Sequence, residues 1–192
     1  MFLSRRKEKR NHEVRVLYLI TAPANKLDKK NRVSGWRFVP LDKKAKQEWR
    51  ALLAPLKGRE VANVIASDLD VEAANVAGSE LRVPVRTEYE YRRFNFGRFH
   101  ARDASVADGA LRIAADKWKS NPDIPVREGD SLTSYRKRFV KSFEKLLESP
   151  NDSLFVTDSR TIHMIRGAFD PQAFIPNGNA IDPKKIYKVK KT

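Results

Sequence analysis

The pattern of apolar and polar positions alternates along the chain between short strand-like runs and stretches with helical periodicity. Short β-branched and aromatic runs, typical of buried strands, occur at residues 14–20, 61–66, 84–89, 153–157 and 186–189. Apolar residues recur every three or four positions at residues 42–56, 68–81, 106–118, 130–147 and 161–169, which predicts amphipathic helices. Strands that alternate with helices indicate an α/β fold, a three-layer sandwich whose mostly parallel central sheet is flanked by helices.

The amino-acid composition excludes several classes of protein but does not identify a function. The 192 residues are 41% hydrophobic and 33% charged, which fits one folded domain. Cysteine is absent and only three histidines occur, so we expect no disulfide, no cysteine nucleophile, no metal site and no cofactor. Neither a secretory signal nor an apolar run of about 18 residues is visible. We therefore expect a cytoplasmic protein, or a virion component if the chain is phage-encoded.

The charge is strongly unbalanced, with 39 Lys and Arg against 24 Asp and Glu, a formal net charge of +15. This excess favours a polyanionic partner, either nucleic acid or an acidic protein surface, although basic termini also serve solubility alone. The residues predicted to bind a polyanion lie near both ends and in the loop after the first strand: Arg5, Arg6, Lys7, Lys9, Arg10, Lys29, Lys30, Lys184, Lys185, Lys188, Lys190 and Lys191. The predicted organisation is a basic arm over 1–12, a domain over 13–183 and a basic tail over 184–192.

Six short segments follow one another in an order that is informative. They are LYLI at 17–20, GWRFVPL at 35–41, ASDL at 66–69, NFGRF at 95–99, EGDSL at 128–132 and VTDS at 156–159. In this order they are similar to a strand ending in Arg-His-Gly, then Gly-Trp…Pro-Leu, Ser-Ser-Asp-Leu, Phe-Gly-x-Trp-Glu, Gly-Glu-Ser-Leu and Val-Thr-His-Gly. The chain thus resembles the histidine phosphatase superfamily, with its phosphoglycerate mutase-like fold, over nearly all its length after the arm.

The resemblance implies phosphoryl transfer through a nucleophilic histidine, with two arginines and a second histidine around the phosphoryl oxygens. At the matching positions this chain has Thr21 and Ala22 for the Arg-His pair, Val71 for the second arginine, Arg93 for the proton donor and Asp158 for the second histidine. The resemblance therefore implies a degenerate pocket without catalytic residues. It predicts an inactive pseudoenzyme that acts as a binding or structural component.

Two other readings remain open at this stage. The first is a phosphoester hydrolase or phosphotransferase with a rearranged site, in which Asp158 forms an aspartyl phosphate and His100 or His163 donates a proton. His100 is the favoured histidine, because its loop covers the site in the family. The second is a protein–protein scaffold in a larger complex, of unknown oligomeric state. In the degenerate pocket we expect Arg93, or its neighbour Arg92, to form an ion pair with Asp158, the alternative being that both side chains point into solvent.

Overall fold

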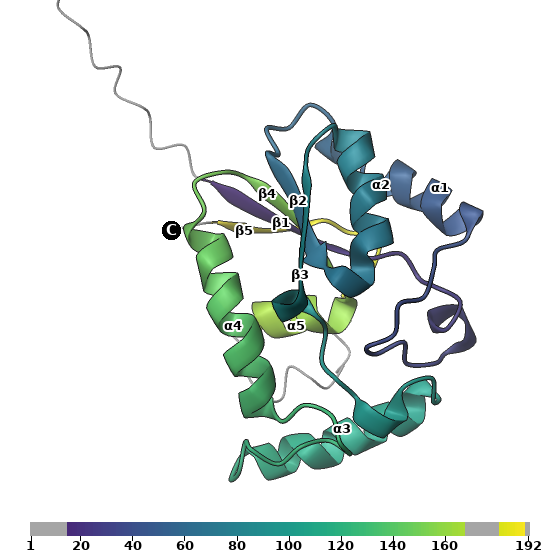
Figure 1. The fold of residues 1–192 in the computed structure, drawn as a ribbon, viewed down its shortest axis with the longest axis vertical. Coiled ribbons are helices and arrows are strands. Elements are labelled where there is room, and N and C mark those ends of the chain that lie inside the picture. Colours follow the sequence, from purple (N-terminus) through teal and green to yellow (C-terminus); the bar gives the residue numbers. More distant parts are fainter. Residues whose placement is uncertain (1–14, 168–180, 191–192) are drawn as a thin grey trace, which may run out of the picture.

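The computed structural model describes residues 15–167 and 181–190. Its centre is a five-stranded sheet in the order β3-β2-β4-β1-β5 (Figure 1). The strands are β1 Val16–Thr21, β2 Asn63–Ser67, β3 Val85–Glu88, β4 Ser153–Thr157 and β5 Tyr187–Lys190. The first four are mutually parallel, and β5 pairs antiparallel with β1 at the edge. The predicted mostly parallel sheet is confirmed.

Helices cover both faces of this sheet, as the alternation of elements predicts. The helices are α1 Lys43–Leu52, α2 Val71–Leu81, α3 Ala104–Trp118, α4 Leu132–Glu148 and α5 Ser159–Arg166. Successive side chains of a strand point to opposite faces. In β1, Leu17 and Leu19 pack in a core cluster with α3, α4 and α5, whereas Tyr18 and Ile20 pack in a second cluster with α1 and α2. The predicted three-layer sandwich is therefore confirmed.

Polar caps and a proline decide where several helices begin and end. Asp42 accepts a hydrogen bond from the backbone N–H of Ala45 at 2.8 Å and so begins α1. The helix predicted over 42–56 ends earlier, at Leu52, and continues as a 3₁₀ turn that contains Pro55. Conversely, α5 begins before the predicted residue 161, because the carboxylate of Asp158 caps it.

The segment after β1 and the segment over 92–101 pack against each other through a glycine and a histidine. Gly35 has φ +52°, and a Cβ there would lie 2.2 Å from Cδ2 of His100. The backbone N–H of Trp36 donates to Nε2 of His100 at 3.4 Å. His100 is therefore a packing residue that holds the two segments together.

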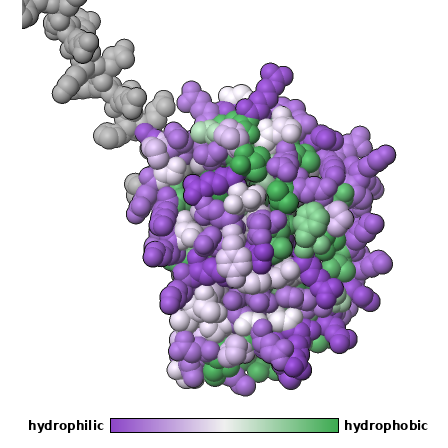
Figure 2. Space-filling model, in the orientation of Figure 1, coloured by the Kyte–Doolittle hydropathy of each residue, from purple (hydrophilic) through white to green (hydrophobic). Residues whose placement is uncertain are grey.

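The surface seen in Figure 2 is mostly hydrophilic and is interrupted by small apolar areas. Among the described residues, no helix is long and apolar enough to cross a membrane. The predicted polyanion-binding residues Arg5, Arg6, Lys7, Lys9, Arg10 and Lys191 lie outside the described residues. Lys188 and Lys190 lie on β5, so this part of the basic C-terminal segment is a strand at the sheet edge, as its sequence predicts. The division into arm, domain and tail stays a prediction.

The half-buried position of His100 predicts a pH dependence of stability. Burial, assisted by the charge of Arg37, lowers the pKa of His100 below its ordinary value of 6.5. Since the folded state disfavours the protonated ring, stability is present above pH 6.5 and is lost as pH falls through the lowered value. We expect the thermal midpoint to fall between pH 7.5 and 5 by less in His100→Gln than in the parent. Equal falls in both proteins, measured by circular dichroism, would contradict this assignment.

Candidate active site

The carboxyl ends of the parallel strands place polar groups together at one edge of the sheet. Thr21 ends β1 and lies opposite Thr157, which ends β4. The backbone N–H of Ala22 donates to the Thr157 carbonyl at 2.6 Å, so Ala22 and Asp158 follow on neighbouring strands. Ligands of open α/β sheets bind outside this edge. We therefore take this edge as the candidate site.

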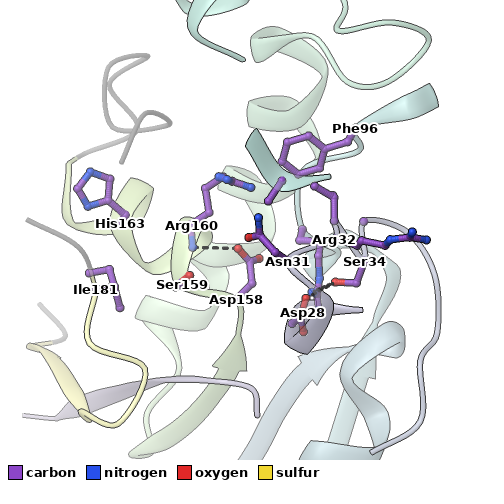
Figure 3. A pocket seen from close by; sticks show the side chains of 14 residues that line it. Asp28, Asn31, Arg32, Ser34, Phe96, Asp158, Ser159, Arg160, His163 and Ile181 are labelled. Carbon is purple, nitrogen blue, oxygen red and sulfur yellow. Dashed lines mark hydrogen bonds between the residues drawn. The ribbon is translucent and has the colours of Figure 1, made fainter. Parts of the chain in front are cut away.

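Two cavities open there, and each has room for a small organic group. Cavity A, about 310 Å³, extends past Arg32, Phe96 and His163, and Figure 3 shows its lining. Cavity B, about 280 Å³, extends past Ala22 and Arg37. The residues that line both cavities are Asp28, Arg93, Asp158 and Ser159. These four residues form the wall that the cavities share.

The structure brings together four of the five residues predicted to form the pocket. Thr21, Ala22, Arg93 and Asp158 all line cavity B. Val71 does not line either cavity, since it is the first residue of α2. Its place at the site is taken by the preceding residue, Asp70, which sequence reasoning missed. The sequence contained one signal for Asp70, namely that its carboxylate comes shortly after the end of the buried strand β2.

Arg93 is held between two elements by a buried ion pair. Its guanidinium pairs with Asp70, and its Nη1 donates to Oγ of Ser34 at 3.0 Å. Asp70 also accepts a hydrogen bond from the Ser67 hydroxyl at 2.7 Å. Burial raises the pKa of the Asp70 carboxyl, although the charge of Arg93 opposes this. Burial by itself lowers the pKa of Arg93. The negative charges of Asp70 and Asp158 outweigh this effect, so the pKa of Arg93 is raised above its ordinary value.

The expected ion pair between Arg93 and Asp158 is therefore not formed. Arg93 takes Asp70 as its partner, and the alternative residue Arg92 binds Asp68, with Nε 2.7 Å from Oδ1. The reason is that Asp158 caps α5. Its Oδ1 accepts from the backbone N–H groups of Arg160 and Thr161 at 2.9 and 3.1 Å, and its Oδ2 accepts from the Thr161 hydroxyl at 2.6 Å.

Unpaired polar atoms concentrate at this site. Within residues 15–167 and 181–190, the buried side-chain atoms without a hydrogen-bond partner are Oγ1 of Thr21 and Thr157, Nε of Arg93 and Arg160, and Oδ1 of Asn63. All but the last belong to residues that line the cavities or end β4. Buried polar atoms are nearly always paired, so such a concentration indicates a site built for a polar ligand.

The histidine nearest the shared wall is not the one that the sequence favours. His163 lines cavity A together with Asp158 and Ser159 (Figure 3). His100 lines neither cavity, because its ring packs against Gly35. In the part of the chain that the structure describes, no group of three His, Cys, Asp or Glu side chains could hold a metal ion. The chemistry available from these residues is therefore that of guanidinium, carboxylate, hydroxyl and imidazole groups.

Solved structures similar to this chain include proteins named as enzymes. YhfR of Bacillus stearothermophilus is 18% identical, with a TM-score of 0.73 over 91% of this chain and 90% of that one. A mycobacterial glucosyl-3-phosphoglycerate phosphatase, solved with VO3, is 16% identical with a TM-score of 0.69 over 93% and 98%. A phosphoglycerate mutase from Bacillus anthracis is 18% identical with a TM-score of 0.69 over 93% and 92%. At these identities the likeness shows the shared fold.

The prediction of a catalytically inactive binding or structural protein is wrong. It rests on substituted positions alone, whereas the family model that matches most of the chain is one of histidine phosphatases, which points to an enzyme. No curated protein matches the sequence. The family model described as histidine phosphatase superfamily (branch 1) matches residues 17–180, most of the chain. With the sheet order, the site at its carboxyl edge and this match in agreement, the chain belongs to the histidine phosphatase superfamily.

Proposed function

We propose that the protein is a phosphoester hydrolase or phosphotransferase with a rearranged active site. The observation that carries this proposal is the shared wall of the two cavities, where Arg93 and Asp158 face the same space beside unpaired buried donors. A guanidinium group suits phosphoryl oxygens, and a carboxylate can attack phosphorus. Ala22 lines the same site and has no reactive group, so the chemistry falls to other residues.

Arg93 is the residue that would bind the phosphoryl group. Its contacts to Asp70 and Ser34 fix the guanidinium plane before a ligand arrives, which lowers the cost of binding. Two more cations stand further out, Arg32 in cavity A and Arg37 in cavity B. Among the described residues neither has a carboxylate within ion-pair distance. Both are therefore available to a bound anion.

Asp158 is the proposed nucleophile and His163 the proposed proton donor. A carboxylate oxygen of Asp158 attacks phosphorus, the bond from phosphorus to the leaving oxygen breaks, and that oxygen takes the proton of the His163 imidazolium. Water then attacks the aspartyl phosphate and gives its proton to neutral His163, which restores both residues and releases phosphate. An alcohol in place of water gives phosphotransfer. The backbone N–H groups that cap α5 orient the Asp158 carboxylate for this step.

Asp158→Asn tests the nucleophile without removing the cap, because asparagine is as good an N-cap as aspartate. We expect kcat on 4-nitrophenyl phosphate and bis(4-nitrophenyl) phosphate to fall by about 100-fold or more. We expect stability to change by less than about 1 kcal/mol. The measurement is steady-state release of nitrophenol together with a thermal melt.

The matched control is Asp103→Asn, since Asp103 caps α3 in the same way and lines neither cavity. It is expected to keep the parent kcat. Equal activity of Asp158→Asn and the parent would remove Asp158 from the mechanism. Absence of turnover of both esters by the parent protein would overturn the proposed function.

We also propose that nucleic acid contacts a basic groove beside β5. Arg59, Lys184, Lys185 and Lys188 line this groove of about 420 Å³. Within the described ranges none of the four lies in an ion pair. Unpaired cations in a concave surface attract phosphates without reading bases. Lys29 contributes less, because it pairs with Asp42 at 2.7 Å.

Replacing Lys184, Lys185 and Lys188 by alanine should weaken binding of a labelled 20-nucleotide DNA. Each lost phosphate contact lowers the slope of log affinity against log salt by about 1, so the slope should fall by up to about 3. Fluorescence anisotropy between 50 and 200 mM salt measures it. Alanine at Lys137, Lys141 and Lys145, which are exposed on α4, is the control of equal charge. The same loss in both triple variants would show that net charge, and not this groove, decides binding.

A further inference from the structure

We propose that the preferred substrate is a phosphodiester, with one organic group in each cavity and its phosphorus at the shared wall. The inference rests on the proposed function and deepens it, because it names the class of phosphoester. Two features of the described residues support it: the two cavities share one set of reactive groups, and that set has an excess of negative charge.

The two cavities make a site with room on both sides of phosphorus. Arg93, Asp158 and Ser159 line cavity A and cavity B alike, and the cavities are of similar size, about 310 and 280 Å³. A phosphate monoester has one organic group and would occupy one cavity only. A phosphodiester has two such groups, and both would be buried. Burial of apolar and ring surface on both sides adds binding energy that a monoester does not gain.

The charge of the shared wall also favours a phosphodiester over a phosphate monoester. Arg93 is its only cation among the four shared residues, and Asp28 and Asp158 are carboxylates. Arg93 is also already paired with Asp70. Asp28 is held close to this group, because its Oδ1 accepts from the Ser34 hydroxyl at 3.2 Å, and Ser34 in turn accepts from Arg93.

Such a wall discriminates by ligand charge. A monoester carries nearly two negative charges above pH 6, whereas a diester carries one. Asp158 is partly buried and Asp28 is exposed, and both repel a second negative charge that approaches them, so the dianion is disfavoured more than the monoanion. The carboxylates at this wall therefore select against monoesters and tolerate the phosphodiester linkage.

The cavities also differ from each other, which sets the direction of the substrate. Cavity B adds Asp70 and Glu72, whose charges are compensated by Arg93 and Lys46, and the guanidinium of Arg37, which lies in no ion pair among the described residues, so it suits a neutral or anionic group. Cavity A adds Arg32 and no further carboxylate, its Arg160 is paired with Asp108, and it contains Phe96, so it suits a neutral or anionic ring. His163 lines cavity A and not cavity B. The group in cavity A is thus the leaving alcohol.

The reaction balances without any further reagent. An oxygen of Asp158 bonds to phosphorus, the bond from phosphorus to the cavity A oxygen breaks, and that oxygen receives the His163 proton. Water then attacks phosphorus, His163 takes a proton from it, and the bond to Asp158 breaks. The products are the alcohol from cavity A and a phosphate monoester that carries the cavity B group. The excess of negative charge then favours release of this dianionic product.

The first experiment compares kcat/KM for bis(4-nitrophenyl) phosphate and 4-nitrophenyl phosphate in the full chain. We expect the diester to be preferred by about 10-fold or more, the effect of an unfavourable charge contact of modest size. Asp28→Asn removes one negative charge from the wall and should reduce this preference by several-fold. Asp116→Asn, an exposed position on α3 outside both cavities, is the matched control and should leave the ratio unchanged.

A second measurement uses the unmodified protein and so does not depend on the folding of a variant. O-phosphoserine becomes a monoanion as pH falls below about 6, whereas dimethyl phosphate is a monoanion throughout. Both compounds are used as competitive inhibitors of diester hydrolysis. The inhibition constant of O-phosphoserine, divided by that of dimethyl phosphate, should be lower at pH 5.5 than at pH 7.5.

The outcomes separate this inference from the proposed function. Asp158-dependent hydrolysis with the monoester preferred would overturn the phosphodiester inference and leave the proposed function standing. An unchanged ratio in folded Asp28→Asn, or equal pH dependence of the two competitors, would also overturn the inference. No turnover of either ester would overturn both.

Discussion

The buried ion pair between Arg93 and Asp70 is the interaction on which the site depends. Asp70 follows β2, and Arg93 lies in the segment over 92–101. Ser67 donates to Asp70, and the indole Nε1 of Trp36 donates to the backbone carbonyl of Arg93 at 2.7 Å, so separate parts of the chain meet around this one pair. Removing one partner of such a pair leaves an uncompensated charge and costs about 3–5 kcal/mol. The pair therefore fixes both the loops and the position of the Arg93 guanidinium.

Contacts between aromatic and cationic side chains also hold the segment that carries Arg93. The Arg92 guanidinium lies 5.0 Å from the ring centroid of Trp36 and 4.6 Å from that of Tyr89, while binding Asp68. Arg138 of α4 lies 4.9 Å from the Trp36 ring and pairs with Asp130 at 2.6 Å. Cation–π contacts of this kind are worth about 0.5–2 kcal/mol each. Together these contacts attach the segment that carries Arg93 to Trp36 and to α4.

Two of the glycine-containing segments that suggest the family have a plain structural explanation. Gly97 has φ +52°, and a Cβ on it would lie 2.1 Å from the backbone oxygen of Arg127. The segments 95–99 and 128–132 thus pack backbone against backbone, and any side chain at Gly97 would separate them. Glycine is required at these positions because a side chain would collide with the backbone, so no catalytic role is needed to explain it. Motifs of this kind identify the fold, and they carry no information on whether the reactive positions still function.

Sequence periodicity was sufficient for the layers of the fold, because burial on one or both faces imposes a 3.6- or 2-residue pattern on each element separately. The resemblance to family motifs, and not periodicity, pointed to Thr21, Ala22 and Asp158, and the parallel strands bring them to one edge of the sheet. The partner of Arg93, the choice of His163 over His100, and the two cavities with their shared wall were not accessible in this way. Arg93 and Asp70 are 23 positions apart, and which carboxylate a buried guanidinium meets depends on how loops from different strands pack. Local pattern determines an element and its buried face, whereas long-range packing alone decides which charged side chains are desolvated together.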